Sequence, residues 1–590
     1  MKKAIILNSV EDAVHCIENG LASGCILFST HSGIDVYLKE NYGLNCRCLS
    51  SFLSDDKTIL NKSYVAEFID NLLDDLDKNV SIEINRQIKT EMKWFAPLYS
   101  YIGKQHYLGY ISFAAAVRNA IDSNRLESIA AYNRKLDFYL DTGSDIYTLL
   151  HTKFDNMQIE FIKLDVHEKD TINKTLWRKI IQNNPLYSIA KGKEYLFDFL
   201  RQYGFSGKRR TVFTDELSYN LKFLKQYLNR SFNVVYYKND FFIKPSCYSK
   251  KHYTNITIPD LSAYLSKRKY DDILEAIVAK DIGDDFIKNI QGYTKKIEIL
   301  QDINRNYPIS VGLWSFPPIK KTKALMFQYL KSEKISIIGA QHGNLYGECY
   351  EPWHFDTDFN RCDYFMTYGF ERNDLERIYP DRNIEGKYLP FGFVNNKKLQ
   401  CNKKKVDIFF PITNSFSVFE NGMNRTAPHE MTSRQIDLLV YLDSLKDVSV
   451  YVKPYIFSDY TNCSVLPLLQ RMNNIKVLYG MKMADFLMKW SPRSILIEYP
   501  SQPLAETIGL DTEIFLMNDR ILPYDKKVLD LLKKRVHFCE STTAVKEKID
   551  LFLHNKLERK RDNEYFTRYV NKLDTERNIT EFIYNTVNDQ

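Results

Sequence analysis

The stretch "KISIIGAQHGNLYG", residues 334–347, passes directly from an apolar β-type run to His342 and a glycine. The preceding "ISVGLWS" (309–315) has the composition of a strand, and "KTKALMFQYLKSEK" (321–334) has the apolar spacing of a helix. These segments predict a β-α-β unit, whose two strands must run parallel. Ligands of open parallel sheets bind beyond the carboxyl ends of the strands, and His342 is predicted to lie there.

The rest of the chain repeats this alternation of strands and helices. Apolar runs typical of strands lie at 3–8, 24–33, 159–166, 210–215, 232–238, 363–370, 406–410, 448–452, 475–479, 494–498, 513–517 and 536–539. The segment from Lys57 to Asp141 has a mostly helical pattern, and the lysine-rich "NNKKLQCNKKK" (395–405) is typical of a linker. We therefore predict an α/β protein of two Rossmann-like, doubly wound domains that face each other across a cleft. The N-terminal domain, residues 1–398, carries a largely helical insertion, and the C-terminal domain is residues 399–590.

Composition narrows the classes of function. The chain has 590 residues, of which 44% are hydrophobic and 26% charged, as in soluble globular proteins. A net charge of +7 is small for this length and does not call for nucleic acid as a partner. No apolar run approaches the length of a transmembrane helix, and ten scattered cysteines without a CxxC spacing favour reduced thiols in a cytoplasm. The sequence contains no ATPase phosphate loop, no dinucleotide fingerprint and no hydrolase nucleophile elbow.

His342 is the first catalytic candidate. A neutral imidazole at a strand end can act as a base, and a protonated one can steady a phosphate or a leaving group. The alternative is a loop histidine with a local hydrogen bond. The following segment, "ECYEPWHFDTDFN", adds Glu351 and Asp356, and either carboxylate can deprotonate an acceptor hydroxyl. Its "DTD" is typical of a metal-binding pair, but no strand context supports that reading, so no metal is expected.

"IEYPSQPLAETIGL" (497–510) is the strongest nucleotide signal. A strand runs into Ser501 and Gln502, where a helix is predicted to begin, and the free N–H groups and positive dipole end of that helix suit a phosphate. Glu506 lies one turn further, where its carboxylate can accept hydrogen bonds from ribose hydroxyls. Pro503 removes one N–H from this first turn. The alternative is an ordinary capped helix.

Two further strand ends are predicted to reach the same edge of the C-terminal sheet. "VYVKPY" (450–455) supplies Lys453 as a counter-charge for phosphate. "PITNSFS" (411–417) supplies three polar side chains for the donor, namely Thr413, Asn414 and Ser415. Each segment alone is more often a solvated loop, so the prediction rests on their convergence.

Contacts to an acceptor are predicted on the N-terminal side. His31 and Ser32 follow the second strand of the chain, and Gln341 directly precedes His342. The lysine-rich runs "KKK" (403–405) and "KLERKR" (556–561) are typical of solvated faces, with a weak attraction to anionic lipid as the alternative.

Several of these motifs occur together in a recognisable order. "IIGAQHGNLYG", "CDYFMTYGF", "YLPFGF", "VKPY" and "EYPSQPLAETIGL" follow one another in a way that resembles bacterial surface-carbohydrate glycosyltransferases of the GT-B type. Such enzymes build capsule, lipopolysaccharide or related glycans. The resemblance covers roughly residues 305–545. It implies that His342 faces the reacting centre and that a nucleotide sugar binds in the C-terminal domain, at Ser501, Gln502, Glu506 and Lys453.

The resulting hypothesis is a glycosyltransferase that moves a sugar from a nucleotide-activated donor to a glycan or glycolipid acceptor. The resemblance implies no cofactor and no bound metal, because helix dipoles and basic side chains stabilise the leaving nucleotide. The alternatives are a CDP-polyol phosphotransferase of the teichoic-acid type, a sugar-nucleotide epimerase, and a non-catalytic scaffold that binds sugar nucleotides. We expect a cytoplasmic protein that can lie peripherally at the inner face of the cell membrane, with no nucleic-acid partner.

Overall fold

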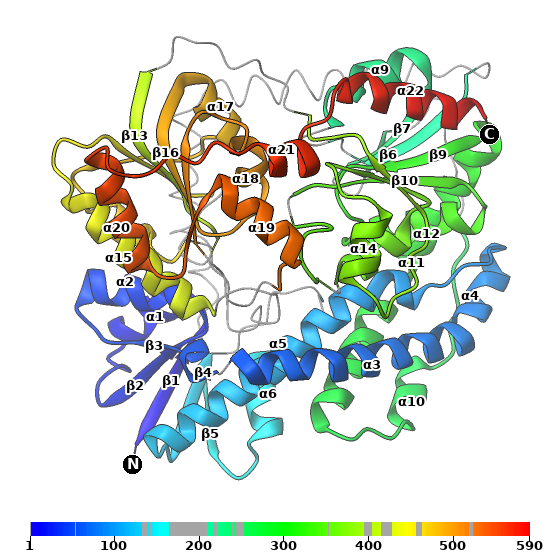
Figure 1. Cartoon of the computed structure of the whole chain (residues 1–590). Helices are drawn as coiled ribbons and strands as arrows, with labels where there is room; N and C mark the ends of the chain where they lie inside the picture. Colours follow the sequence, from blue (N-terminus) through cyan, green and yellow to red (C-terminus); the bar gives the residue numbers. More distant parts are fainter. Residues whose placement is uncertain are drawn as a thin grey trace.

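In the described residues, the computed structural model contains three β-sheets flanked by helices, and the sheets occupy separate parts of the molecule (Figure 1). The structure describes residues 2–53, 55–132, 140, 143–163, 209–215, 217, 221–238, 241–243, 253–343, 345–351, 353–394, 404–414, 427–455, 463–517 and 523–589. At 55–62, 238, 241–243, 353 and 356 it describes the backbone alone.

The first sheet is five-stranded and parallel, in the order β3 (Arg47–Cys48), β2 (Cys25–Ser29), β1 (Lys3–Leu7), β4 (Ser128–Tyr132) and β5 (Gln158–Ile162). Helices α1 (Val10–Glu18) and α2 (Ser32–Tyr42) connect its first strands. The helical pattern predicted after Lys57 is confirmed by α3 (Asp55–Asn79), α4 (Ser81–Ile88) and α5 (Phe95–Asn124). The predicted helical stretch also contains β4, a central strand of this sheet.

The second sheet has seven strands, in the order β12 (Lys387–Pro390), β11 (Tyr364–Thr367), β10 (Ser336–Ala340), β9 (Ile309–Trp314), β6 (Thr211–Asp215), β7 (Asn233–Lys238) and β8 (Phe241–Ile243). Every neighbouring pair is parallel except β7 and β8. The predicted β-α-β unit is confirmed as β9, α12 (Lys321–Ser332) and β10. The chain proceeds outward from β6 in one direction and from β9 in the other, so the topological switch point lies between these two strands.

The third sheet has six parallel strands, in the order β15 (Ile475–Val477), β14 (Val450–Lys453), β13 (Lys404–Pro411), β16 (Trp490–Ile497), β17 (Glu513–Met517) and β18 (His537–Cys539). Its switch point lies between β13 and β16. Around it stand α15 (Pro428–Ser444), α16 (Leu466–Leu469), α17 (Met483–Lys489), α18 (Gln502–Thr507), α19 (Lys526–Arg535) and α20 (Thr542–Leu553).

These sheets confirm the predicted α/β class and its Rossmann-like domains. The structure adds one feature: the segment predicted as a single N-terminal domain contains two separate sheets. A helical layer joins them, because α5 packs against α3, against the long α11 (Ile273–Asn306) and against α12 of the second sheet (Figure 1). The strands predicted at 3–8 and 24–33 therefore belong to a separate sheet and do not extend the one that carries β10.

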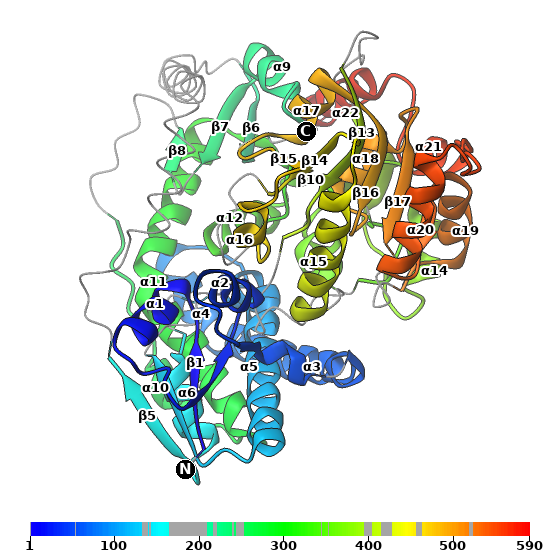
Figure 2. The same ribbon diagram turned by 90° about the vertical axis from the view of Figure 1, so that its left-hand side faces the viewer.

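The C-terminal segment returns to the second sheet. Helix α21 (Glu564–Tyr569) leads to α22 (Thr575–Asn588), which lies against the second sheet (Figures 1 and 2). Ile579, Ile583 and Val587 of α22 belong to the same buried cluster as Val311 and Ile338. The end of the chain is thus part of the core that supports β9 and β10.

Close packing fixes the position of β10. A Cβ atom at Gly339 would lie 2.3 Å from the indole ring of Trp314, which is fully buried on the neighbouring strand. Only a residue without a side chain lets the indole lie across β10 at this point. The strand that carries His342 is therefore held at a set distance from β9.

Candidate functional site

The switch point of the seven-stranded sheet holds a buried ion pair. The ammonium of Lys323 donates to the carboxylate of Asp215 at the end of β6, and to the backbone oxygen of Phe316 at 2.5 Å. Ser315 completes the cluster, because its backbone N–H and its hydroxyl both donate to Asp215 Oδ1 at 3.2 Å. Burial lowers the pKa of Lys323, and the charge of Asp215 opposes that effect. The switch point, where sheets of this kind bind ligands, thus contains a buried ion pair in which Asp215 balances the ammonium of Lys323.

His342 lies beside this pair, at the end of β10. Its imidazole is half-buried and packs against the ring of Phe316, with 4.6 Å between ring centroids. Burial, assisted by the positive charge of Lys323, lowers the pKa of His342 to about 3. The imidazole is therefore neutral at physiological pH, which is the form that can accept a proton.

A hydrogen-bonded chain extends from His342 into the core. Its Nδ1 lies 2.8 Å from the hydroxyl oxygen of Tyr346, and that hydroxyl donates to Asp358 Oδ1 at 3.2 Å. Thr357 also donates its hydroxyl to Asp358. Tyr346 has one hydroxyl proton, so when Asp358 takes it, Tyr346 can only accept from His342 Nδ1–H. This arrangement leaves the lone pair of His342 on Nε2, which lies farther from Tyr346, at 3.4 Å.

Asp358 lies in the protein interior, away from solvent. Its side chain is fully buried, and burial raises its pKa to about 7 despite the opposing hydrogen bonds from Thr357 and Tyr346. His354 stacks on the ring of Tyr346 with 4.0 Å between centroids, and burial lowers the pKa of His354 to about 3. Within the described part of the chain, Nδ1 of His354 is buried without a hydrogen-bond partner.

Other residues predicted near His342 have different surroundings. The side-chain amide of Gln341 links the segments that follow β10 and β11. Its Nε2 donates to the backbone oxygen of Gly343, and its Oε1 accepts from the backbone N–H of Tyr368, both at 2.7 Å. The backbone N–H of Glu351 donates to the hydroxyl of Tyr379 at 2.9 Å. Asp356 lies in α13 (Trp353–Thr357), and its side chain is outside the described residues.

Two of the three residues predicted on the acceptor side, His31 and Ser32, lie where α2 meets α15. His31 is the N-cap residue of α2. The hydroxyl of Ser32 is buried between the domains, 2.7 Å from the hydroxyl of Thr432 and 3.1 Å from that of Ser464. Figure 2 shows α2 beside α15 and α16 at this contact. Ser32 therefore joins two parts of the protein, and its contact with an acceptor stays a prediction.

The switch point of the six-stranded sheet carries a second buried carboxyl group. Glu498, directly after β16, accepts from the backbone N–H of Thr413 at 2.9 Å and from Gln435 Nε2 at 3.0 Å. Burial raises the pKa of Glu498 to about 7. Next to Thr413, Asn414 Oδ1 is buried and has no hydrogen-bond partner among the residues that the structure describes. Ser415, predicted with these residues, is outside the described part.

The remaining donor residues gather at neighbouring strand ends. Lys453, the last residue of β14, is 8% exposed, and its Nζ donates to the oxygen of Pro454 at 3.3 Å. Burial lowers its pKa, and the charge of Glu506 acts in the opposite direction. Gln502 donates to Glu506 Oε1 at 2.7 Å across one turn of α18. Ser501 is the N-cap residue of α18 but makes no side-chain cap bond. Lys453 and Glu506 thus share one electrostatic environment, as the sequence predicts.

The two sheet edges are joined through the segment that follows His342. Leu345 and Cys349 form an apolar cluster with Tyr499, which immediately precedes the predicted donor segment, and Tyr524 packs against it. The backbone N–H of Asp525 donates to the oxygen of Glu348 at 2.9 Å. The loop after β10 therefore lies against Tyr499, which follows β16, while the meeting of His342 with the donor residues in one site stays a prediction.

Sequence reasoning missed several residues of this site, namely Asp215, Lys323, Tyr346, Asp358, Gln435 and Glu498. Asp215 ends β6 and Glu498 directly follows β16, so each is an acid at a strand end, and this position marks them in retrospect. Lys323 and Gln435 carry no such mark, because each lies within an amphipathic helix. The structure alone shows that these two side chains turn inward.

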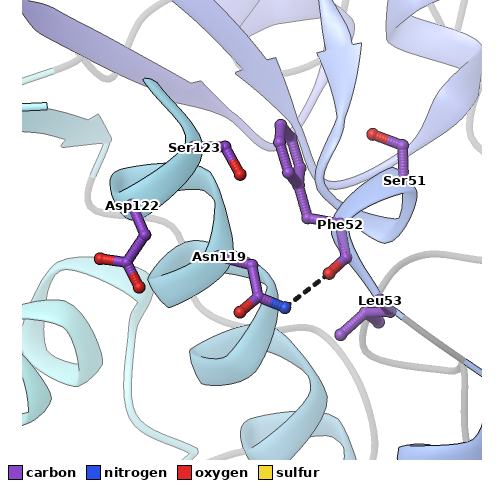
Figure 3. Close-up of a pocket in the computed structure, with 6 residues that line it drawn as sticks. All are labelled: Ser51, Phe52, Leu53, Asn119, Asp122 and Ser123. Atoms are coloured by element: carbon purple, nitrogen blue, oxygen red, sulfur yellow. Dashed lines mark hydrogen bonds between the residues drawn. The ribbon is translucent and has the colours of Figure 1, made fainter. Parts of the chain in front are cut away.

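A pocket of about 390 Å³ lies apart from these residues. It is lined by six residues of η1 (Leu49–Phe52), the following turn and α5, namely Ser51, Phe52, Leu53, Asn119, Asp122 and Ser123 (Figure 3). Asn119 donates to the backbone oxygen of Phe52 at 2.7 Å across it. It contains none of the residues predicted to be catalytic.

Among the described residues, no group of three or more histidine, cysteine or carboxylate side chains is placed to hold a metal ion. None of the helices in the described ranges combines the length and the apolarity needed to cross a membrane.

Comparisons with known proteins identify one family. A model described as "LIC12162 family transferase" matches residues 126–512, which include the whole second sheet and the third sheet through α18. A search of curated protein sequences finds no match.

Among solved structures, UDP-GlcNAc 2-epimerase from Neisseria meningitidis bound to UDP-GlcNAc is 11% identical, with a TM-score of 0.36, and the match covers 64% of this chain and 100% of that chain. UDP-GlcNAc 2-epimerase from Methanocaldococcus jannaschii in complex with UDP-GlcNAc and UDP is 9% identical, with a TM-score of 0.39, and the match covers 63% and 99%. Structural similarity at this level supports no statement about function.

Proposed function

Because the chain belongs to the LIC12162 family of transferases, we propose that it is a glycosyltransferase that moves a sugar from a nucleotide-activated donor to a hydroxyl group of a surface glycan. The acceptor class is capsule, lipopolysaccharide or a related bacterial glycan. The enzyme works in the cytoplasm, with peripheral contact to the inner face of the membrane where its acceptor is a glycolipid.

One observation carries this proposal: a neutral histidine held at the carboxyl edge of a parallel sheet, next to a second sheet edge with a buried lysine. His342 Nε2 accepts the proton of the acceptor hydroxyl, while the hydroxyl oxygen attacks the anomeric carbon of the donor. The bond from that carbon to the nucleotide phosphate breaks, and the phosphate leaves with the bonding electrons. The apolar cluster of Leu345, Cys349 and Tyr499 supports this arrangement, because it packs the loop that follows His342 against the residue that precedes the donor segment.

The donor binds at the six-stranded sheet. The ammonium of Lys453 is the counter-charge for the leaving phosphate, because burial strengthens its interaction with an anion. Glu506, kept in place by Gln502 at 2.7 Å, accepts hydrogen bonds from ribose hydroxyls. Ser501 and the polar residues after β13, Thr413 and Asn414, complete the contacts. The positive charge of Lys453 stabilises the leaving phosphate, as a metal ion does in other transferases. Turnover is therefore expected to be unchanged in excess EDTA.

The first experiment identifies the donor. Thermal unfolding is measured with CMP, UDP, GDP and their sugar conjugates. A ligand at a hundred times its dissociation constant adds about 2.7 kcal/mol of stability, so a true donor raises the unfolding temperature clearly. The proposal fails if none of these nucleotides stabilises the protein. Stabilisation by a CDP-linked polyol alone would instead indicate polyol phosphate transfer.

Two variants then test the residues, with turnover followed as release of the nucleotide. His342→Gln is expected to lower turnover at least about 100-fold, as loss of a general base does, with nucleotide binding unchanged. Lys453→Met is expected to weaken nucleotide binding about 10-fold or more, since a charge-assisted contact is lost. The matched controls are His554→Gln and Lys482→Met, which change exposed side chains. Full turnover in His342→Gln would refute the assignment of the base.

A further inference from the structure

We propose that Tyr346 and Asp358 form a proton relay behind His342, and that Asp358 is the final acceptor of the proton taken from the attacking hydroxyl. This inference rests on the proposed function, because it concerns the same base. Asp358 and Tyr346 act through His342 and are therefore positioning residues.

The relay answers a difficulty in the chemistry of His342. Its imidazole packs against the ring of Phe316 and lies near the ammonium of Lys323. Burial and the positive charge of Lys323 disfavour a positive imidazolium and lower the pKa of His342 to about 3, so a proton that stayed on the ring at pH 7 would be held in an unfavourable form. A base in this position needs a route by which the proton leaves it.

The geometry supplies that route. His342 takes the acceptor proton on Nε2 and passes its Nδ1 proton to the hydroxyl oxygen of Tyr346, 2.8 Å away. Tyr346 passes its own hydroxyl proton to Asp358 Oδ1, 3.2 Å away. One proton enters the chain at Nε2 and one arrives at the carboxylate, so His342 and Tyr346 both end neutral. Asp358 becomes a neutral carboxylic acid, the form favoured by a fully buried position.

The groups around Asp358 fit a carboxyl group that changes its charge near neutral pH. Burial raises its pKa to about 7, and the positive charges of Arg361 and Lys323 lower it less strongly. The titratable and charged groups that face Asp358 or its hydrogen-bonded partner Tyr346 come from several elements, and they are Tyr101, Lys323, His342, His354, Arg361, Cys362, Tyr368 and Tyr388. Lys323 is already bound to Asp215. Asp358 is thus ionised before the reaction above pH 7 and can hold a proton afterwards at little cost.

The tautomer of His342 tests without any substrate whether the hydrogen bonds run in the direction that the relay needs. A purely structural chain would show the same tautomer, and the dependence of turnover on pH distinguishes it from a relay. The full chain is labelled with ¹⁵N-histidine, and long-range ¹H–¹⁵N spectra are recorded from pH 6 to pH 8. The His342 signals are identified by their loss in His342→Gln. We expect a neutral ring with its proton on Nδ1, and Tyr346→Phe is expected to move that proton to Nε2, because the hydrogen bond that selects the tautomer is lost.

A matched control exists in the first sheet. His15 Nδ1 lies 3.1 Å from the hydroxyl of Tyr132, so Tyr132→Phe removes a tyrosine–histidine hydrogen bond of the same kind. It is expected to change the signals of His15 and to leave those of His342 unchanged. A proton on Nε2 of His342 in the wild-type protein at pH 8, where Asp358 is ionised, would overturn the relay.

The second measurement is the dependence of turnover on pH, followed as nucleotide release from whichever UDP-, GDP- or CMP-sugar stabilises the protein. In the wild type kcat is expected to rise with pH through about 7, since a protonated Asp358 cannot accept a proton. Asp358→Asn is expected to lose this rise and to lower kcat about 100-fold, with KM unchanged. Tyr346→Phe breaks the same chain at its middle and gives the same prediction, so it serves if Asp358→Asn does not fold.

The outcomes separate this inference from the proposed function. A pH profile that keeps its rise near pH 7 in Asp358→Asn, or a loss of kcat below about threefold in both variants, would refute the relay and leave His342 as the base. Absence of nucleotide release in the wild type would refute the proposed function, and the tautomer experiment would then still decide whether the chain from His342 to Asp358 exists.

Discussion

Replacement of Glu348 by Gln is expected to make the protein less sensitive to alkaline pH. Glu348 is 1% exposed, and its Oε2 accepts from the hydroxyl of Tyr565 in α21 at 2.8 Å. Burial raises its pKa from the ordinary 4.5 to about 8, and the hydrogen bond from Tyr565 opposes this only in part. At neutral pH the group is therefore mostly a neutral acid, which glutamine mimics in shape and in its ability to accept a hydrogen bond.

The sign and size of the effect follow from linkage between protonation and folding. A carboxyl group with a raised pKa in the folded state contributes stability that is complete below its unfolded pKa and is lost as the pH rises through its folded pKa. A shift from 4.5 to about 8 corresponds in total to about 5 kcal/mol. Most of this is already lost at pH 7, and the further loss between pH 7 and pH 9 is about 1.4 kcal/mol. Glu348→Gln removes the ionisable group and so removes this part of the pH dependence.

The assay is urea-induced unfolding at pH 6, 7 and 9, compared between the wild type and Glu348→Gln. Other buried carboxyl groups with a raised pKa, such as Asp35, titrate in both proteins and cancel in the difference. The stability of the variant relative to the wild type is expected to increase by about 1.4 kcal/mol from pH 7 to pH 9. Glu547→Gln, at an exposed position of α20, is the control and should run parallel to the wild type. Parallel curves for Glu348→Gln as well would refute the reasoning.

Two further substitutions test packing and domain contacts. Gly339→Ala places a methyl group 2.3 Å from the ring of Trp314. It is expected to lower the free energy of unfolding by about 1–3 kcal/mol and to lower turnover as well. Unchanged stability in urea would contradict the packing described for β10. Ser32→Ala removes a buried hydroxyl that lies between those of Thr432 and Ser464, so a loss of about 1–3 kcal/mol is expected. Faster hydrogen exchange in α2 and α15 should accompany it, and a loss confined to other elements would show that Ser32 does not join the two domains.

Most of the second sheet and all of the third could be predicted because their strands are short apolar runs between helices; the edge strands β8 and β12 were not predicted. The run at 335–340 and the helix before it appear in the structure as β10 and α12. The separate first sheet could not be predicted, because its central strand β4 lies far along the chain from β1, after the long helix α5. Sequence order places such a strand next to its neighbours in the chain, whereas backbone pairing joins Ile129 to Ala4.

The positions of His342 and Lys453 at strand ends were predictable, because each segment has the pattern of a strand. Burial lowers the pKa of both side chains, as is common for functional groups, and their roles stay predictions. Asp358 was visible only as one acid within a cluster of several. Its importance comes from burial and from its distance to the hydroxyl of Tyr346, and neither follows from spacing along the chain.

The pairing of β4 has a consequence for how the chain can be divided. The matched family region begins at residue 126, shortly before β4, and so includes β4 and β5 but not β1, which pairs with the other side of β4. A shorter chain that began at this boundary would expose the backbone N–H and C=O groups along one edge of β4, and such an edge invites association with other strands. The first fifty residues are therefore not an appendage to the transferase but one half of a sheet whose other half lies inside it.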